Sequence, residues 1–250
     1  MLLPISAVAV SATYEPAGLA ELRIDNAIAR VKVIPEARSG IAVGVQQGKS
    51  GPPLRITRAG ASVVIDGQEP QAGFSFVPQW LSRWFRKDRC PAEAPGVPMV
   101  TAHVPMNTRV SISGAISGEI GGTTTLSFNA RGCGDWRLGP VERQLVIDTS
   151  STGRIRAAKV GGTLAIHSSG SGGIAIDSGH IPTARIILLG PGGVSHKGSM
   201  GGLFAEVKSS GVIKVKEIYG LVDAEVVGSG DVFYARPAAK RYCATSPSSC

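Results

Sequence analysis

A repeat of about 19 residues constrains this chain more than any other feature of its sequence. Each copy places an apolar residue two positions after a glycine, and successive copies follow one another at a nearly constant interval. The apolar positions are Ile116, Trp136, Ile155, Ile174, Val194, Ile213 and Val232, and the glycines are Gly114, Gly134, Gly153, Gly172, Gly192, Gly211 and Gly230. A unit this short cannot bury its own apolar face, so it must stack on copies of itself.

The pattern inside each copy indicates short β-strands. Apolar and polar residues alternate in twos, as in "GRIRAA" and "LVID", and no copy holds a helical period. Glycine suits a sharp bend or a close approach between neighbouring turns. The sequence therefore predicts an all-β fold, a right-handed single-stranded parallel β-helix with coils of about 19–20 residues. A left-handed β-helix would require a six-residue repeat, which the sequence lacks.

Composition agrees with this fold and indicates the charge of the expected partner. The chain of 250 residues has 33 glycines, 43% hydrophobic residues and 5% aromatic residues, which suits a long and narrow core. Its net charge of +8 and pI of about 9.6 favour an anionic partner, such as an acidic glycan or an envelope surface. No nucleic-acid-binding motif and no long basic run is present, so we expect no nucleic-acid partner.

The chain divides into five segments. Residues 1–12 resemble the end of a secretory signal peptide with a cleavage site after Ala12, although an ordinary first strand is the alternative. Irregular β-coils are predicted over 19–67, an aromatic and basic insertion over 68–97, the regular β-helix over 98–237 and a polar tail over 238–250. No stretch reaches the roughly 18 apolar residues of a transmembrane helix. The signal-peptide interpretation leads us to expect a periplasmic, cell-surface or secreted protein.

The insertion holds the densest group of aromatic residues in the chain. Trp80 and Trp84 are four residues apart, on one side of a potential helical turn, with Arg83 between them. One interpretation is a cap that covers an end or flank of the solenoid, where an exposed sheet edge would promote aggregation. The alternative is an interfacial anchor or partner-docking segment over residues 74–89.

Four cysteines are an even number, compatible with an oxidising compartment. The simplest pairing joins Cys243 to Cys250 and Cys90 to Cys133, but three connectivities exist and free buried thiols are the alternative. The spacings show no CxxC metal pattern. We expect no metal site and no cofactor.

A basic stripe is the main candidate binding surface. If Ile155 and its equivalents point inward, the next residue of each copy points outward, and these positions read Ser117, Arg137, Arg156, Ala175, Ser195, Lys214 and Phe233. The candidate binding residues are Arg137, Arg156 and Lys214, with Trp80, Trp84 and Arg83 of the insertion as a second group. Ordinary solubilising charge is the alternative interpretation.

Two in-register sets of polar residues are candidates for chemistry. Glu206 and Glu225 are one repeat apart, each between inward positions, so stacking would place the two carboxylates on neighbouring coils. A separation of about 5 Å would suit a retaining glycosidase or a cation site. A solvated surface balanced by lysines is the simpler interpretation. The second set is Asn129, Asp148 and His167, which has no nucleophile in register.

Several phrases also resemble a known family. The quoted stretches are "LRIDNAIARVKVIP", "SSTGRI", "GSGGIAI", "SSGVIKV" and "GSGDVFY". They are similar to the bacterial head GIN domain family, often named as autotransporter adhesins, and to related β-strand-repeat adhesins, over about residues 19–236. The resemblance implies a secreted or cell-envelope β-helix with no catalytic residues.

Three functions remain open at this point. A non-enzymatic binding or adhesion scaffold leads, followed by a polymer-forming solenoid of the bactofilin type and by a carbohydrate-active enzyme that uses Glu206 and Glu225. Oligomeric state and ligand identity are left open by the sequence.

Overall fold

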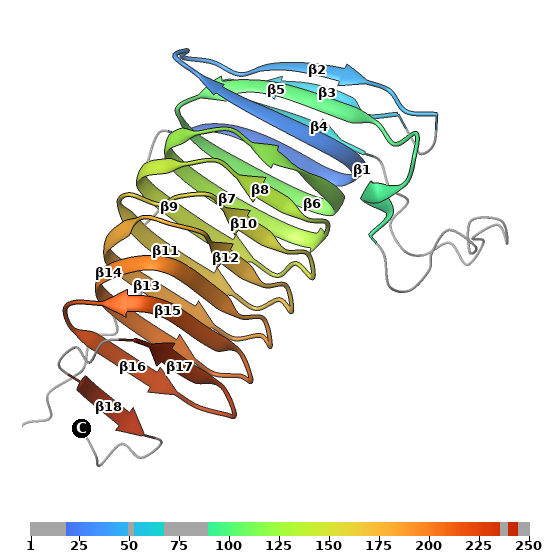
Figure 1. The fold of residues 1–250 in the computed structure, drawn as a ribbon. Coiled ribbons are helices and arrows are strands. Elements are labelled where there is room, and N and C mark those ends of the chain that lie inside the picture. Colours follow the sequence, from blue (N-terminus) through green and yellow to red (C-terminus); the bar gives the residue numbers. More distant parts are fainter. Residues whose placement is uncertain (1–18, 50–52, 68–89, 236–239, 245–250) are drawn as a thin grey trace, which may run out of the picture.

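The computed structural model describes residues 19–49, 53–67, 90–235 and 240–244. Their strands stack as a parallel β-solenoid of about seven turns (Figure 1). The helical structure in this part of the chain is one short 3₁₀ turn, η1 (Pro91–Glu93). The all-β class and the parallel stacking are therefore confirmed.

Two faces account for most of the strands, and we name them face A and face B. Face A contains β2 (Ala42–Gln46), β5 (Met99–Pro105), β8 (Trp136–Leu138), β10 (Ile155–Ala157), β12 (Ile174–Ile176), β15 (Val212–Ile218) and β17 (Asp231–Tyr234). Face B contains β3 (Arg55–Ala59), β4 (Ser62–Asp66), β7 (Thr123–Cys133), β9 (Val141–Thr149), β11 (Thr163–Ser168), β13 (His180–Leu188), β16 (Val222–Val226) and β18 (Lys240–Ala244). Three longer strands contribute to both faces: β1 (Ala20–Glu36), β6 (Asn107–Ile120) and β14 (Val194–Val207).

The register of face A follows the repeat from Trp136 onward. Each apolar position pairs with its equivalent in the next coil, in the order Trp136, Ile155, Ile174, Val194, Ile213 and Val232. All six are at most 4% exposed, so they point into the core. The glycine-and-apolar repeat is thus the coil period of the solenoid.

The first step of the predicted register is wrong. Gly118, not Ile116, lies opposite Trp136, and the outward position before Arg137 is Glu119 rather than Ser117. Space is the physical reason, because a Cβ at position 118 would lie 2.2 Å from the Val31 oxygen of the neighbouring coil and 3.2 Å from the indole. The indole Nε1–H also donates to the Ile116 carbonyl at 2.9 Å. A small-residue repeat alone does not anticipate such a two-residue shift.

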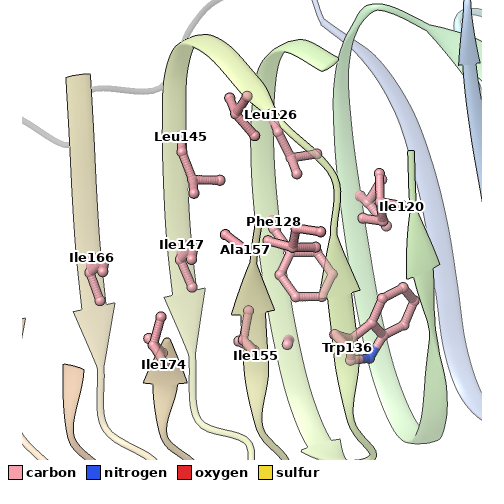
Figure 2. Close-up of a cluster of buried hydrophobic side chains, with 14 of the residues drawn as sticks. Ile120, Leu126, Phe128, Trp136, Leu145, Ile147, Ile155, Ala157, Ile166 and Ile174 are labelled. Atoms are coloured by element: carbon pink, nitrogen blue, oxygen red, sulfur yellow. The ribbon is translucent and has the colours of Figure 1, made fainter. Parts of the chain in front are cut away.

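The core is a continuous column of inward side chains from both faces. Figure 2 shows face B residues such as Leu126, Phe128 and Ile147 against face A residues such as Trp136 and Ile155. The rings of Phe128 and Trp136 lie 5.0 Å apart at an angle of 56°, a favourable tilted arrangement. Aliphatic residues fill most of the rest, as the low aromatic content predicts.

Glycine is required at the corners because neighbouring coils touch there. A Cβ on Gly153 or Gly172 would lie 2.0 Å from the backbone oxygen of Gly134 or Gly153 in the preceding coil. The backbone of Gly134 also has a φ of +116°, whereas Gly153 and Gly172 do not have positive φ. The requirement at Gly172 is therefore close approach rather than an unusual backbone conformation.

The N-terminal end, where the sequence predicts irregular coils over 19–67, combines parallel and antiparallel pairing. β1 comes first in the chain but lies second in the stack, between the coil of β4 and β5 and the coil that β6 begins. β2 pairs antiparallel with β5, and β3 pairs antiparallel with β4 (Figure 1). Antiparallel strands therefore lie outermost at this end of the described chain.

Several predictions fall outside the described residues. These are the signal-peptide interpretation of 1–12, the aromatic part of the insertion with Trp80, Arg83 and Trp84, and most of the tail over 238–250. Of the predicted 68–97 segment, the structure describes 90–97. No helix in the described part of the chain has the length and apolarity to span a membrane.

Candidate functional site

The three cations of the predicted basic stripe, Arg137, Arg156 and Lys214, lie on the outward side of face A. The register places Arg137 directly opposite Arg156, so these two predicted residues do come together. Lys214 lies three coils beyond Arg156, because Ala175 and Ser195 occupy the two intervening positions. The predicted stripe is therefore interrupted by small residues in its middle.

This interruption forms an open groove of about 730 Å³, which we call the face A groove. Its floor comes from two neighbouring coils and consists of Gly173, Ala175, Gly193 and Ser195. Arg154 and Arg156 line one wall, and Val212 and Lys214 line the other. The groove exists because two successive copies of the repeat have side chains no larger than a methyl or hydroxymethyl group at their outward positions.

Asp177 and Lys197 line one end of the groove, directly after the strand positions that form the floor. Arg156 donates from Nε to Asp177 Oδ2 at 2.5 Å, and Lys197 Nζ lies 3.5 Å from Asp177 Oδ1. The hydrogen bond from Arg156 lowers the pKa of Asp177, and the same bond raises the pKa of Arg156. The carboxylate therefore remains ionised and orients both cations at the groove.

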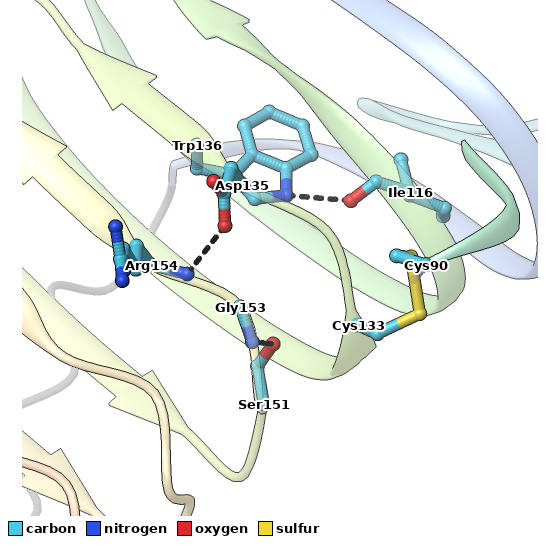
Figure 3. The surroundings of a disulfide bond; sticks show 8 residues. All are labelled: Cys90, Ile116, Cys133, Asp135, Trp136, Ser151, Gly153 and Arg154. Atoms are coloured by element: carbon cyan, nitrogen blue, oxygen red, sulfur yellow. Dashed lines mark hydrogen bonds between the residues drawn. A yellow bond between two sulfur atoms is a disulfide. The ribbon is translucent and has the colours of Figure 1, made fainter. Parts of the chain in front are cut away.

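The other cations of the groove have no such partner. Within the described chain, neither the Arg137 nor the Arg154 guanidinium forms an ion pair. Asp135, close to Arg154 in Figure 3, accepts from the Arg154 backbone N–H at 2.8 Å. Lys214 Nζ lies 6.0 Å from the centre of the exposed Phe233 ring, at the outer limit of a cation–π contact. Five cations and two carboxylates thus line the groove, and its field is positive.

Asp177 and Lys197 were not singled out from the sequence. They are one repeat apart and each comes directly after an inward apolar or histidine position, so the repeat could have placed them side by side. Their connection to Arg156 could not be found in this way, because it depends on side-chain conformation.

Glu206 and Glu225 also lie opposite each other, on face B. They border a shallow hollow of about 150 Å³ together with Arg185 and Asp223. Lys208 Nζ lies 2.5 Å from Glu206 Oε1, and this hydrogen bond raises the pKa of Lys208. A lysine thus neutralises part of the carboxylate pair, as in the solvated-surface interpretation.

The other set of polar residues, Asn129, Asp148 and His167, forms a row across neighbouring strands of face B. The register aligns Asn129 with Asp148 and Asp148 with His167, and His167 Nδ1 lies 3.5 Å from Asp148 Oδ1. Among the described residues, no group of three His, Cys, Asp or Glu side chains gathers as a metal site would need.

His196 faces the core rather than either surface. It is 2% exposed, its Nε2 lies 3.3 Å from the Ser199 carbonyl oxygen, and its Nδ1 has no hydrogen-bond partner. Burial lowers the pKa of His196 below its usual range. The imidazole is therefore a neutral core group at neutral pH.

A disulfide fastens the described end of the insertion to the solenoid. Cys90 and Cys133 are bonded, with their Cα atoms 5.6 Å apart (Figure 3). Arg30 of β1 adds hydrogen bonds to the carbonyls of Ala92 and Glu93 at 3.3 and 2.9 Å. The pairing of Cys243 with Cys250 stays a prediction, because Cys250 and the side chain of Cys243 lie outside the described part of the chain.

Comparison with known proteins supports the fold. No protein-family model matches the chain, and no curated protein matches it. A crystal structure from Bacteroides fragilis, described as a "putative adhesin", is 14% identical with a TM-score of 0.59, over 87% of this chain and 92% of that one. A Clostridium sporogenes structure, described as a "putative cell adhesion protein", is 11% identical over 88% and 96% of the two chains, with a TM-score of 0.27. The first likeness shows a shared fold.

Proposed function

We propose that this chain is a non-enzymatic binding or adhesion scaffold of the cell envelope or cell surface, and that it binds an anionic partner through face A. One observation carries the proposal: Arg137, Arg154 and Arg156 lie on neighbouring coils, and Asp177 engages Arg156 alone of the three. Like charges placed opposite each other across strands are unfavourable, so a bound anion would relieve their repulsion.

Other observations support the location and the class. The Cys90–Cys133 disulfide is typical of an oxidising compartment, in agreement with a periplasmic or secreted protein. The Bacteroides fragilis neighbour described as an adhesin is compatible with a binding scaffold, and membership of the head GIN domain family remains part of the proposal. The hypothesis of an interfacial contact through residues 74–89 is retained as a second route to a surface.

Retention on a heparin matrix tests the role of face A. We expect the wild-type chain to bind at low salt and to elute as salt rises, because exposed charges are screened over about 8 Å at physiological ionic strength. Changing Arg137, Arg156 and Lys214 together to Ser should greatly reduce retention. The matched control changes Arg58, Lys159 and Arg185 to Ser, which removes the same charge from exposed positions that do not line the face A groove.

The comparison between these two variants decides the proposal. Equal retention of both would mean that net charge alone drives binding and would contradict a face A site. If the wild-type chain cleaves the glycan and Glu225→Gln does not, the enzyme hypothesis replaces the scaffold proposal. Filaments in electron micrographs would favour the polymer-forming solenoid instead.

A further inference from the structure

We propose that the face A groove holds one acidic sugar unit of a polysaccharide, seated between the wall of Arg154 and Arg156 and the wall of Lys214. This inference rests on the proposed function and specifies its ligand. It differs from general attraction to a charged surface, because it requires the small-residue floor as well as the cations.

The dimensions of the groove set the size of the ligand. Three coil steps separate Arg156 from Lys214, which is about 14 Å at the usual spacing of β-strands. The two intervening coils present Ala175 and Ser195, with Gly173 and Gly193 beside them. Long side chains extend from both walls, so the free space has the width of a single sugar ring rather than of a folded domain.

The chemistry of the groove fits a ring that bears a carboxylate or a sulfate. The floor offers backbone, one methyl group and the Ser195 hydroxyl, which match the C–H face and the hydroxyls of a sugar. Arg154 has no ion-pair partner in the described chain, and a guanidinium can bind a carboxylate or sulfate with two hydrogen bonds. The hydrogen bond from Arg156 to Asp177 orients the Arg156 guanidinium at the end of the groove before binding, and Lys197 lies within ion-pair distance of the same carboxylate.

Other anionic partners fit this groove less well. Single-stranded nucleic acid gains affinity by stacking several bases on exposed aromatic rings. The aromatic residue that lines the groove, Trp136, is buried in the core, and the exposed Phe233 ring lies one coil beyond Lys214, outside the groove lining. A flat bilayer would reach the cations of the walls but not a floor recessed between them. The recessed floor is therefore the feature that favours a sugar.

Filling the floor without changing any charge provides the test. The variant Ala175→Leu/Ser195→Leu places two apolar side chains in the groove and keeps all five cations. Ala165→Leu is the matched control, since Ala165 is an outward, half-buried small residue of face B. Calorimetric titrations use a galacturonate hexasaccharide, a heparin hexasaccharide, single-stranded DNA of similar charge and phosphatidylglycerol vesicles.

We expect at least one of the two acidic hexasaccharides to bind wild type and Ala165→Leu equally, and to bind the floor variant at least about tenfold more weakly. If the floor variant binds as wild type while the Arg137, Arg156 and Lys214 variant loses binding, the groove proposal is overturned and the face A proposal stands. If neither variant loses binding, both proposals fall. Floor-dependent binding of DNA or vesicles at the affinity of the sugars would overturn the assignment to an acidic sugar.

Discussion

Replacing Gly172 by alanine should destabilise the solenoid strongly, and the adjacent Gly173 supplies the control. A Cβ at Gly172 would lie 2.0 Å from the Gly153 oxygen, whereas one at Gly173 would lie 3.9 Å from the Gly193 oxygen, an ordinary contact. Neither position has a positive φ, so the two substitutions differ mainly in whether the neighbouring coil leaves room.

The size of the effect follows from the way the coils are held. The Gly172 N–H donates to the Ser151 oxygen at 3.1 Å, and the flanking strands β10 and β12 pair directly. Separating the coils enough to fit a methyl group would disrupt several ladder hydrogen bonds, each worth about 1 kcal/mol net. We expect Gly172→Ala to lower the free energy of unfolding by about 3 kcal/mol, in the range of other severe backbone substitutions.

Thermal and urea unfolding followed by circular dichroism measure this difference. A loss of about 3 kcal/mol corresponds to a fall in Tm of roughly 6–12 °C for a chain of this size. Gly173→Ala should stay within about 1 kcal/mol of wild type, because a tolerated alanine also restricts the unfolded chain. Equal midpoints for the two variants would refute the close contact between Gly172 and the Gly153 oxygen on which this prediction rests.

Three further predictions concern the core and its covalent link. Trp136→Phe should cost about 2–3 kcal/mol in urea unfolding, because the Ile116 carbonyl loses its donor and a void opens beside Gly118; an unchanged midpoint would contradict this. Because burial lowers the folded-state pKa of His196, its contribution to stability is full above the unfolded value near 6.5 and is lost as pH falls toward the folded value. His196→Val should remove that part of the pH dependence, and an identical pH slope in the variant would count against it. Changing Cys90 and Cys133 together to Ser should cost about 4 kcal/mol, from a sequence separation of 43 residues, and unfolding at the wild-type urea concentration would show that the disulfide contributes little.

The coil period could be predicted because each copy repeats a steric requirement. Gly153 must let the next coil approach, and Ile155 must fill the shared core, so both features recur in the sequence at the same interval. From Trp136 to Val232 this interval alone gives the correct pairing.

The N-terminal end could not be predicted in the same way. Alternation of apolar and polar residues is the same in parallel and antiparallel strands, so it does not reveal that β2 and β3 run against their neighbours. Nor does it reveal that β1 inserts between β5 and β6, which depends on contacts between segments far apart in the sequence.

Part of the candidate site could be predicted from the sequence. Outward positions beside the repeat identified Arg137, Arg156 and Lys214, but a linear stripe gives no sign that Ala175 and Ser195 form a recessed floor. A groove depends on the heights of neighbouring side chains across coils. The bridge from Asp177 to Arg156 and Lys197 depends further on rotamers that a repeat does not encode.

Lysine footprinting tests the central claim, that face A is the binding surface, most directly. Reductive methylation of the wild-type chain, with and without an acidic hexasaccharide, is read by mass spectrometry at each lysine. We expect the ligand to protect Lys197 and Lys214, which line the groove, and to leave the exposed Lys49 and Lys159 as reactive as before. Equal protection of all four lysines, or protection confined to Lys49 and Lys159, would contradict a binding site on face A.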